Sequence, residues 1–319
     1  MDGCCTMMLN GTRILPGEEK KINISIARLP SRSALEINIT VSRSELDGPV
    51  LLLMGAMHGD EINGTEVVRR LIESQSHRPT RGTTICIPII NIYGFISSSR
   101  YVPDGKDVNR SFPGNARGSL ASRVAHYLTR NIVPKIDYGI DFHTGGATRV
   151  NYPQIRGVLS DPDVTAMAHA FNAPFTIDAR YRPASLRQWA ARQGKKILVY
   201  EGGETGRFDE FAIKEGIDGT LRLMHYLNMR DDAPPTQAPT RIIKHTSWVR
   251  AAYSGIFLTR VSPGQAITRG QELGTLNDPY GDFSQPIRST TAGDVLGLNQ
   301  NPVVHQGDAL MHVGQELKS

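Results

Sequence analysis

Apolar and polar residues alternate in two stretches near the start of the chain. The first stretch runs from Ile22 to Ile26, and the second runs from Leu35 to Val41. A period of two is typical of strands that bury one face and expose the other. We therefore predict an opening pair of antiparallel strands.

The next part of the chain alternates between apolar runs and helical spacing. Val50 to Met54 is apolar at every position, as in strands that are covered on both faces, and apolar residues recur at helical spacing over Glu66 to Ile72. The same succession predicts further strands at 84–90, 138–142 and 196–200 and helices at 119–134, 163–171 and 209–228. We therefore predict an α/β fold with a mixed, mostly parallel sheet flanked by helices.

The pattern changes after residue 230. Residues 231–241 are rich in proline, which is typical of a linker, and residues 242–319 contain short runs broken by glycine. We predict three parts: a first domain at 1–230, a linker at 231–241 and a small all-β domain at 242–319. The turn pattern of the last part resembles biotinyl/lipoyl-like, barrel-sandwich domains. We expect it to pack beside the site entrance or to mediate homo-oligomerisation.

Composition and charge exclude several classes of protein. With 39% hydrophobic and 21% charged residues, the chain has the composition of a folded globular protein. Its net charge is +5, but no run of basic residues exceeds two, so we expect no nucleic-acid partner. The longest apolar run, Val50 to Met57, falls short of the ~20 residues that span a bilayer, so we expect no membrane partner.

The three cysteines indicate a reducing compartment. Cys4 and Cys5 are adjacent and Cys86 lies in an apolar run, which does not make a disulfide framework. The adjacent pair could bind metal, but two free thiols explain it as well. Because the first residues also lack the pattern of a signal peptide, we predict a cytoplasmic location.

Two histidines and a glutamate follow predicted strands. His58 and Glu61 lie three residues apart after the strand at 50–54, and His143 follows the strand at 138–142. The carboxyl ends of strands form the sites of α/β sheets, and two imidazoles with one carboxylate are a ligand set of catalytic zinc. Glu61 could instead stabilise the start of a helix, and His143 could be a buried core histidine. Asp141 is a candidate to orient His143.

A long polar loop separates these elements. Residues 99–114 have few apolar anchors and include Arg100 and Arg110. Loops of this length are often functional, and two arginines could bind a carboxylate and polarise a carbonyl. A solvated surface loop is the alternative interpretation.

Four motifs follow one another along the chain. They are Gly55-x-x-His58-Gly59-Asp60-Glu61, Asp107-Val108-Asn109-Arg110-Ser111-Phe112-Pro113-Gly114, Asp141-Phe142-His143-Thr144 and Tyr200-Glu201-Gly202-Gly203. In this order and at these separations they resemble the succinylglutamate desuccinylase/aspartoacylase family, a branch of the zinc carboxypeptidase fold. The resemblance covers roughly residues 48–229, and it is strongest to members with a C-terminal β domain that are known only as predicted deacylases.

The resemblance implies a role for each residue of the site. Zinc, one ion per chain, would be bound by His58, Glu61 and His143. Arg100 would polarise the scissile carbonyl and stabilise its oxyanion, and Glu201 would be the general base, with Glu204 as a rival for that role. Asn109 and Arg110 would hold the α-carboxylate of the substrate.

We therefore predict a zinc-dependent hydrolase that deacylates a small N-acyl amino acid or a related metabolite. One alternative is a metallocarboxypeptidase that acts on a peptide C-terminus, and another is a catalytically silent module that binds a metal or an anion. Three arginines precede the strand at 196–200 and could contact an acidic acyl group, although we favour solvated side chains for each of them: Arg180, Arg182 and Arg187.

Overall fold

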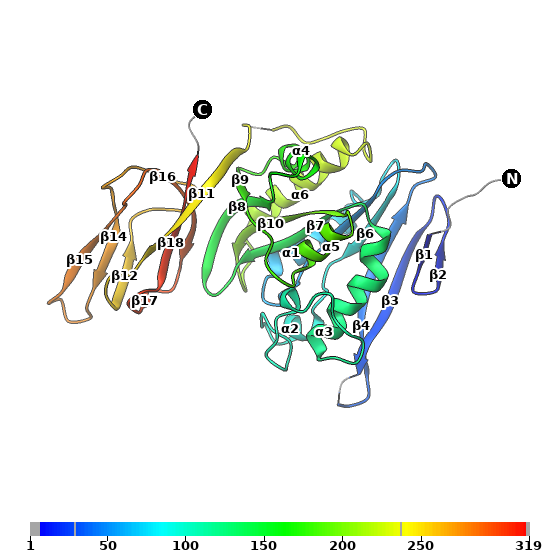
Figure 1. Cartoon of the computed structure of the whole chain (residues 1–319), viewed down its shortest axis with the longest axis horizontal. Helices are drawn as coiled ribbons and strands as arrows, with labels where there is room; N and C mark the ends of the chain where they lie inside the picture. Colours follow the sequence, from blue (N-terminus) through cyan, green and yellow to red (C-terminus); the bar gives the residue numbers. More distant parts are fainter. Residues whose placement is uncertain (1–6, 29, 237, 317–319) are drawn as a thin grey trace.

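A computed structural model describes residues 7–28, 30–236 and 238–316. A sheet of twelve strands runs through the molecule. A sheet of four strands packs against the strands that the C-terminal part of the chain adds to the large sheet (Figure 1). The helices are α1 (Ile62–Glu73), α2 (Ile92–Ile96), α3 (Leu120–Tyr127), α4 (Pro162–Phe171), α5 (Leu186–Arg192) and α6 (Glu210–Tyr226), with helical turns η1 (Val108–Arg110), η2 (Leu128–Ile132) and η3 (Val133–Lys135).

The strands form three sheets. In order across the large sheet they are β13 (Ala266–Ile267), β16 (Gly293–Asn299), β18 (Ala309–Glu316), β11 (Arg241–Arg250), β9 (Phe175–Asp178), β8 (Arg149–Gly157), β10 (Lys196–Glu204), β7 (Tyr138–Gly145), β5 (Val50–Met54), β6 (Thr83–Ile87), β4 (Ala34–Arg43) and β3 (Glu19–Arg28). The smaller sheets are β15 (Ser284–Arg288), β14 (Glu272–Asn277), β12 (Gly255–Thr259) and β17 (Val303–Val304), and the hairpin of β1 (Met7–Leu9) and β2 (Thr12–Ile14).

The large sheet is mixed, and only part of it fits the prediction of a mostly parallel sheet. Strands β10, β7, β5 and β6 are parallel neighbours, and β9 is parallel to both β8 and β11. The pairs β6–β4, β4–β3 and β8–β10 are antiparallel. The reason lies in the connections. A short link permits an antiparallel pair, as between β3 and β4, while parallel neighbours need a longer crossover such as α1.

The central strands are buried on both faces. Leu52 and Met54 of β5 pack in a core with α3 and α5, while Leu51 and Leu53 pack in a second core with α1, α4 and α6. This explains why Val50 to Met54 is apolar at every position. The two layers of helices leave the carboxyl ends of the central strands as the edge where the site forms.

The sequence-based elements are confirmed where their pattern was strong. The opening antiparallel pair is β3 and β4, the apolar run is β5, and the other expected strands and helices are β6, β7, β10, α1, α4 and α6. The helix predicted at 119–134 is instead divided into α3, a π-helical turn and η3, which contains Pro134. Proline cannot donate a helical hydrogen bond, so an unbroken helix would not continue past it. The sequence-based prediction missed α2, α5, β8 and β9.

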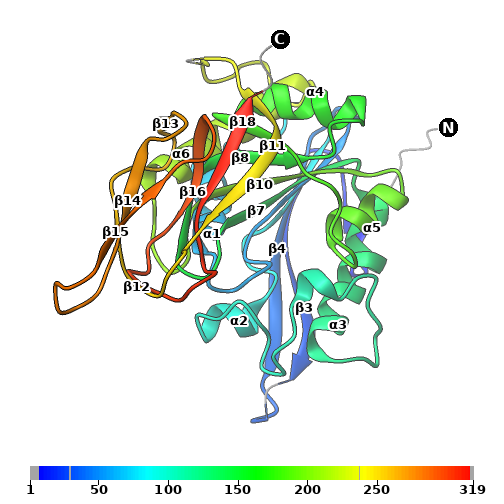
Figure 2. The ribbon, with the colours of Figure 1, turned by 60° about the vertical axis from the view of Figure 1, so that its left-hand side comes forward.

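Strands of the C-terminal part continue the large sheet. Figure 2 shows β11, β18 and β16 side by side; β11 pairs with β9 in parallel, and β16 pairs with β8. The expected β structure is present across the described residues after 240, where no helix occurs. The division into two domains with a linker at 231–241 stays a prediction. The pair Cys4 and Cys5 lies outside the described residues.

Within the described part of the chain, no helix combines the length and the apolar character needed to cross a membrane.

Candidate metal centre and active site

His58 is presented by a tight turn at the end of β5. Ala56, two residues earlier, has a φ of 48°, a conformation that costs free energy for a residue with a side chain. Gly59 then passes so close to α2 that a Cβ atom on it would lie 1.8 Å from the carbonyl carbon of Gly94. The buried turn therefore fixes the position of His58, whose side chain is almost fully covered.

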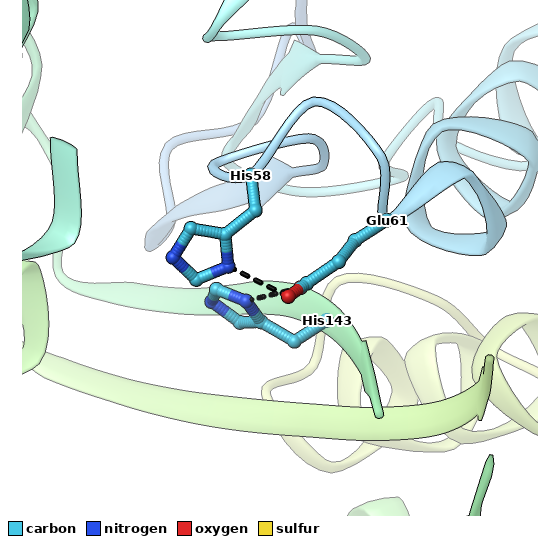
Figure 3. A group of neighbouring side chains, drawn as sticks. All are labelled: His58, Glu61 and His143. Atoms are coloured by element: carbon cyan, nitrogen blue, oxygen red, sulfur yellow. Dashed lines mark hydrogen bonds and ion pairs between the residues drawn. The ribbon is translucent and has the colours of Figure 1, made fainter. Parts of the chain in front are cut away.

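Glu61 precedes α1 but does not cap it. Its side chain makes no capping hydrogen bond and instead points at the two histidines (Figure 3). The Nδ1 atom of His58 lies 2.7 Å from Glu61 Oε1, and the Nδ1 atom of His143 lies 2.7 Å from Glu61 Oε2. The Thr144 amide also donates to Glu61 Oε2 over 3.2 Å. The Glu61 carboxylate is therefore bonded to the two histidines and the Thr144 amide and not to the first amides of α1.

The donor set of this cluster fits a metal ion. One ligand atom from each of His58, Glu61 and His143 lies within 4.8 Å of the others, and all three residues are buried. Burial alone would raise the pKa of the Glu61 carboxyl, but the two imidazoles outweigh it and hold that pKa below its usual range. An ionised carboxylate with two Nδ1 atoms turned toward one point is a ligand set that suits zinc.

A carboxylate lies behind each histidine. His58 Nε2 is 3.3 Å from Asp107 Oδ1, and His143 Nε2 is 2.9 Å from Asp141 Oδ2. The second contact lacks the alignment of a hydrogen bond. Such outer carboxylates orient metal-binding imidazoles and make them more basic. Asp141 was a candidate for this position, whereas Asp107 was not recognised as one.

Arg100 lies against the same cluster. Its Nη2 donates to Asp107 Oδ2 over 2.9 Å, and its Nη1 donates to Glu61 Oε1 over 3.2 Å. These two contacts hold the Arg100 guanidinium beside the pair of histidines. The Leu186 amide at the start of α5 donates to Asn109 Oδ1 over 3.0 Å.

Glu201 stands beside His143 on the neighbouring strand. The parallel register of β10 and β7 pairs these two residues, so their side chains leave the sheet on the same face. Asn151 donates to Glu201 Oε2 over 2.5 Å, and Arg156 lies 3.5 Å from Glu201 Oε1. The rival Glu204 instead pairs with Arg207 at 3.6 Å.

The site lies in a cleft of about 670 Å³. Its lining contains each residue that the resemblance assigned to metal binding, catalysis or carboxylate binding, and also Arg180, Arg182 and Arg187. Arg187 in addition donates to the backbone carbonyls of residues 156, 179 and 180. The predicted residues in the lining are His58, Glu61, Arg100, Asn109, Arg110, His143 and Glu201.

The sequence-based prediction missed one wall of the cleft. Asn151, Arg149 and Arg156 come from β8, and Trp248 and His312 come from β11 and β18. A bulge between β8 and β10 adjoins Glu201, and bulges of this kind re-aim side chains beside sites. No local sequence pattern identifies these residues, because they come together only when strands from distant segments of the chain pair.

A family model for the succinylglutamate desuccinylase/aspartoacylase catalytic domain matches residues 47–227. The chain belongs to this family. The match includes both histidines, Glu61, Arg100 and Glu201, so the sequence-based resemblance is confirmed.

Relatives extend the likeness to nearly the whole chain. N-alpha-acetyl-L-2,4-diaminobutyric acid deacetylase of Halomonas elongata is 30% identical over 305 residues, which cover 90% of this chain and 87% of the relative. Together with the family, it shows that the chain is an enzyme that hydrolyses amide bonds.

Solved structures show the same fold. The succinylglutamate desuccinylase/aspartoacylase of Rhodobacter sphaeroides is 26% identical, with a TM-score of 0.83 over 94% of this chain and 96% of its own. The product-bound ectoine utilization protein EutE (DoeB) of Ruegeria pomeroyi is 23% identical, with a TM-score of 0.82 over 93% of this chain and 94% of its own. The mixed sheet with its helices is therefore the architecture of this family.

Proposed function

We propose that this enzyme is a zinc-dependent deacylase of a small N-acyl amino acid or a related metabolite, built on a zinc carboxypeptidase-like fold and acting in the cytoplasm. The observation that carries the proposal is the convergence of His58 Nδ1 and His143 Nδ1 on the two oxygens of Glu61, in a cleft that also holds Arg100 and Glu201. These three ligands would hold one zinc ion per chain.

The ion would supply one part of the chemistry. Bound zinc polarises a carbonyl and lowers the pKa of water to about 7. Asp107 and Asp141 keep the two imidazoles turned toward the ligand position. The site is thus arranged before the substrate binds.

Two side chains of the cleft act on the amide itself. Glu201 removes a proton from the attacking water as its oxygen bonds to the carbonyl carbon, and the same carboxyl returns the proton to the amine when the C–N bond breaks. Arg100 donates hydrogen bonds to the oxygen on which negative charge develops, so it stabilises the transition state more than the substrate. The products are a carboxylate and a free amine.

Asn109 and Arg110 would position the amino-acid part of the substrate. Arg110 is exposed at the rim of the cleft and donates to the Asn109 carbonyl over 2.6 Å, which leaves the rest of its guanidinium for a carboxylate. An amide and a guanidinium side by side suit the α-carboxylate of an N-acyl amino acid.

Metal content and amine release test the proposal together. We expect about one zinc per wild-type chain, loss of that zinc in His143→Ala, and amine release by the wild type from some member of a panel of N-acetyl, N-succinyl and N-formyl amino acids. His305→Ala is the matched control, because His305 is exposed and distant in sequence from the cluster.

Full activity without zinc would contradict the proposed mechanism. Zinc binding with cleavage of peptides alone would favour a carboxypeptidase, and zinc binding without any turnover would favour a silent binding module.

A further inference from the structure

A second cavity, of about 690 Å³, is lined partly by residues 113–117, which follow Asn109 and Arg110 closely in the chain. Its other walls come from the end of α3 with the turn η2 and from the end of α5. Among the described residues, none lines both this cavity and the catalytic cleft. Sites for small molecules have volumes of about 300 to 1,000 Å³. The cavity is thus a candidate binding site outside the catalytic cleft.

The lining of this cavity is positively charged. Arg117, Arg130 and Lys195 contribute to it, whereas no Asp or Glu of the described chain does. Lys195 lies 3.8 Å from the exposed Asp137, but the two arginines, both exposed, have no ion-pair partner among the described residues. A concave surface with charges of one sign raises the local concentration of ions of the opposite sign. The cavity therefore favours an anion that carries more than one negative charge.

An indole ring gives the same cavity an apolar wall. Trp189 of α5 lines it together with Pro113 and Pro134. Trp189 is half-buried and packs against the core that also contains Leu52 of β5, so its ring is held in place. Aromatic side chains bind other planar rings by stacking. The cavity thus offers a planar apolar surface beside its three cations.

Two features of the backbone indicate that the fold itself forms the cavity. Gly114 has a φ of 79°, and a Cβ atom on it would lie 2.2 Å from the carbonyl oxygen of Ser122 in α3. The end of the loop therefore packs directly on the helix, which only glycine permits. Thr129 and Arg130 lie in η2, a π-helical turn, and such turns are frequent at functional sites.

The segments that line the cavity also position a substrate-binding residue of the cleft. The Leu186 amide at the start of α5 donates to Asn109 Oδ1 over 3.0 Å, and Trp189 lies in the same helix. The Phe112 amide donates to the Ala184 carbonyl over 3.1 Å, and Phe112 borders the part of the loop that lines the cavity. A ligand in the cavity would therefore contact both segments that hold Asn109.

We propose that this cavity is an effector site for a phosphate ester of a planar ring, such as a free mononucleotide, and that its occupancy lowers KM for the N-acyl substrate. A phosphate ester carries about 1.5 to 2 negative charges near neutral pH, which suits three cations, and arginine binds phosphate through two parallel hydrogen bonds. The ring of the ligand stacks on Trp189. A bound ligand orders the loop that carries Asn109, so less ordering is left for the substrate to bring about. The effect on KM rests on the proposed deacylase function, whereas binding in the cavity does not.

Calorimetric titration with AMP tests the site. We expect saturable binding of about one AMP per chain, and at least about tenfold weaker binding of adenosine, which lacks the phosphate, and of ribose 5-phosphate, which lacks the ring. Arg130→Gln and Trp189→Leu should each weaken AMP at least about tenfold. Arg110→Gln in the catalytic cleft and Arg269→Gln, at an exposed arginine outside both cavities, should keep the wild-type affinity. Absence of saturable binding, or equal losses in Arg130→Gln and Arg110→Gln, overturns the site.

Steady-state kinetics tests the effector role. With an N-acyl amino acid that the wild type hydrolyses, saturating AMP should lower KM at least about fivefold and leave kcat and zinc content unchanged. Arg130→Gln should have the wild-type KM without AMP and should not respond to the same concentration of AMP. Bound AMP with an unchanged KM overturns the effector role, and a rise in KM that persists in Arg130→Gln places AMP in the cleft and overturns the proposal. A zinc-loaded wild type that hydrolyses no N-acyl amino acid overturns the proposed function instead, while the titration still decides the site.

Discussion

The two walls of the cleft differ in how their side chains are held. On the chemical wall, formed by His58, Glu61, Arg100, His143 and Glu201, each side chain contacts an oppositely charged or polar neighbour, although His143 Nε2 has no hydrogen-bond partner among the described residues. On the recognition wall, formed by Arg149, Arg156, Trp248 and His312, the rings of Trp248 and His312 stack and the Arg149 guanidinium lies over the same indole. The chemical wall is thus ordered mainly by charged and polar contacts, whereas the recognition wall is ordered mainly by stacking.

The largest effect on the chemical wall should come from Arg100→Gln. We expect kcat to fall about 10²- to 10³-fold with little change in KM, because the lost hydrogen bonds act on charge that develops only in the transition state. Steady-state kinetics at saturating zinc measures this effect. Arg110→Gln is the matched change at the rim of the cleft and should mainly raise KM. A rise in KM alone for Arg100→Gln would move Arg100 from catalysis to substrate binding.

Asp107→Asn should weaken the metal centre without removing a ligand. We expect zinc affinity to fall about 10- to 100-fold, since a carboxylate behind an imidazole orients it and makes it more basic. A zinc titration against a competing chelator gives the affinity. Asp104→Asn is the control from the same loop, where the exposed Asp104 accepts from the nearby Lys106 amide. Equal losses in both variants would contradict a specific role for Asp107.

The chemical wall could be predicted from sequence because its residues follow strong local patterns. His58 comes after the all-apolar β5, and His143 lies near the end of β7. The strand at 196–200 placed Glu201 at the same edge, and the parallel register with β7 confirms that position. Parallel strands bring their carboxyl ends to one edge, so elements with clear patterns were enough to assemble this wall.

The recognition wall could not be predicted for physical reasons. β8 contains Pro153, which argues against a strand inside a sheet, and a bulge beside it shifts the register against β10. Trp248 and His312 reach the cleft only because β11 and β16 pair with strands of the first part of the chain. Such pairing depends on the folded arrangement and not on any local spacing of residues.

Asn151 connects the two walls, and its removal should have an intermediate effect. Its amide donates to Glu201 Oε2, so Asn151→Ala should leave the base less well positioned and lower kcat about tenfold. We expect KM for the N-acyl substrate to change little, because Asn151 acts as a positioning residue through Glu201. Unchanged kcat with altered KM would assign Asn151 to the recognition wall.

The smallest effect should come from Glu66, which lies outside both walls and tests whether stability and catalysis are separable. Glu66 of α1 accepts hydrogen bonds from Arg69 and Arg70, and these arginines, Arg69 foremost, lower its pKa from 4.5 to about 2. Because the folded-state pKa of Glu66 is depressed, the stabilisation that its ion pairs give the folded protein is complete above pH 4.5 and is lost as the pH falls toward 2.

Glu66→Gln should therefore lower the free energy of unfolding by about 1 kcal/mol at pH 7 in urea, and the difference from wild type should shrink between pH 4.5 and 2. Glu73→Gln, at an exposed partner of Arg69, should cost less. Activity should stay at the wild-type level in both variants, and a pH-independent difference for Glu66→Gln would show that its ion pairs are not the source of the stabilisation.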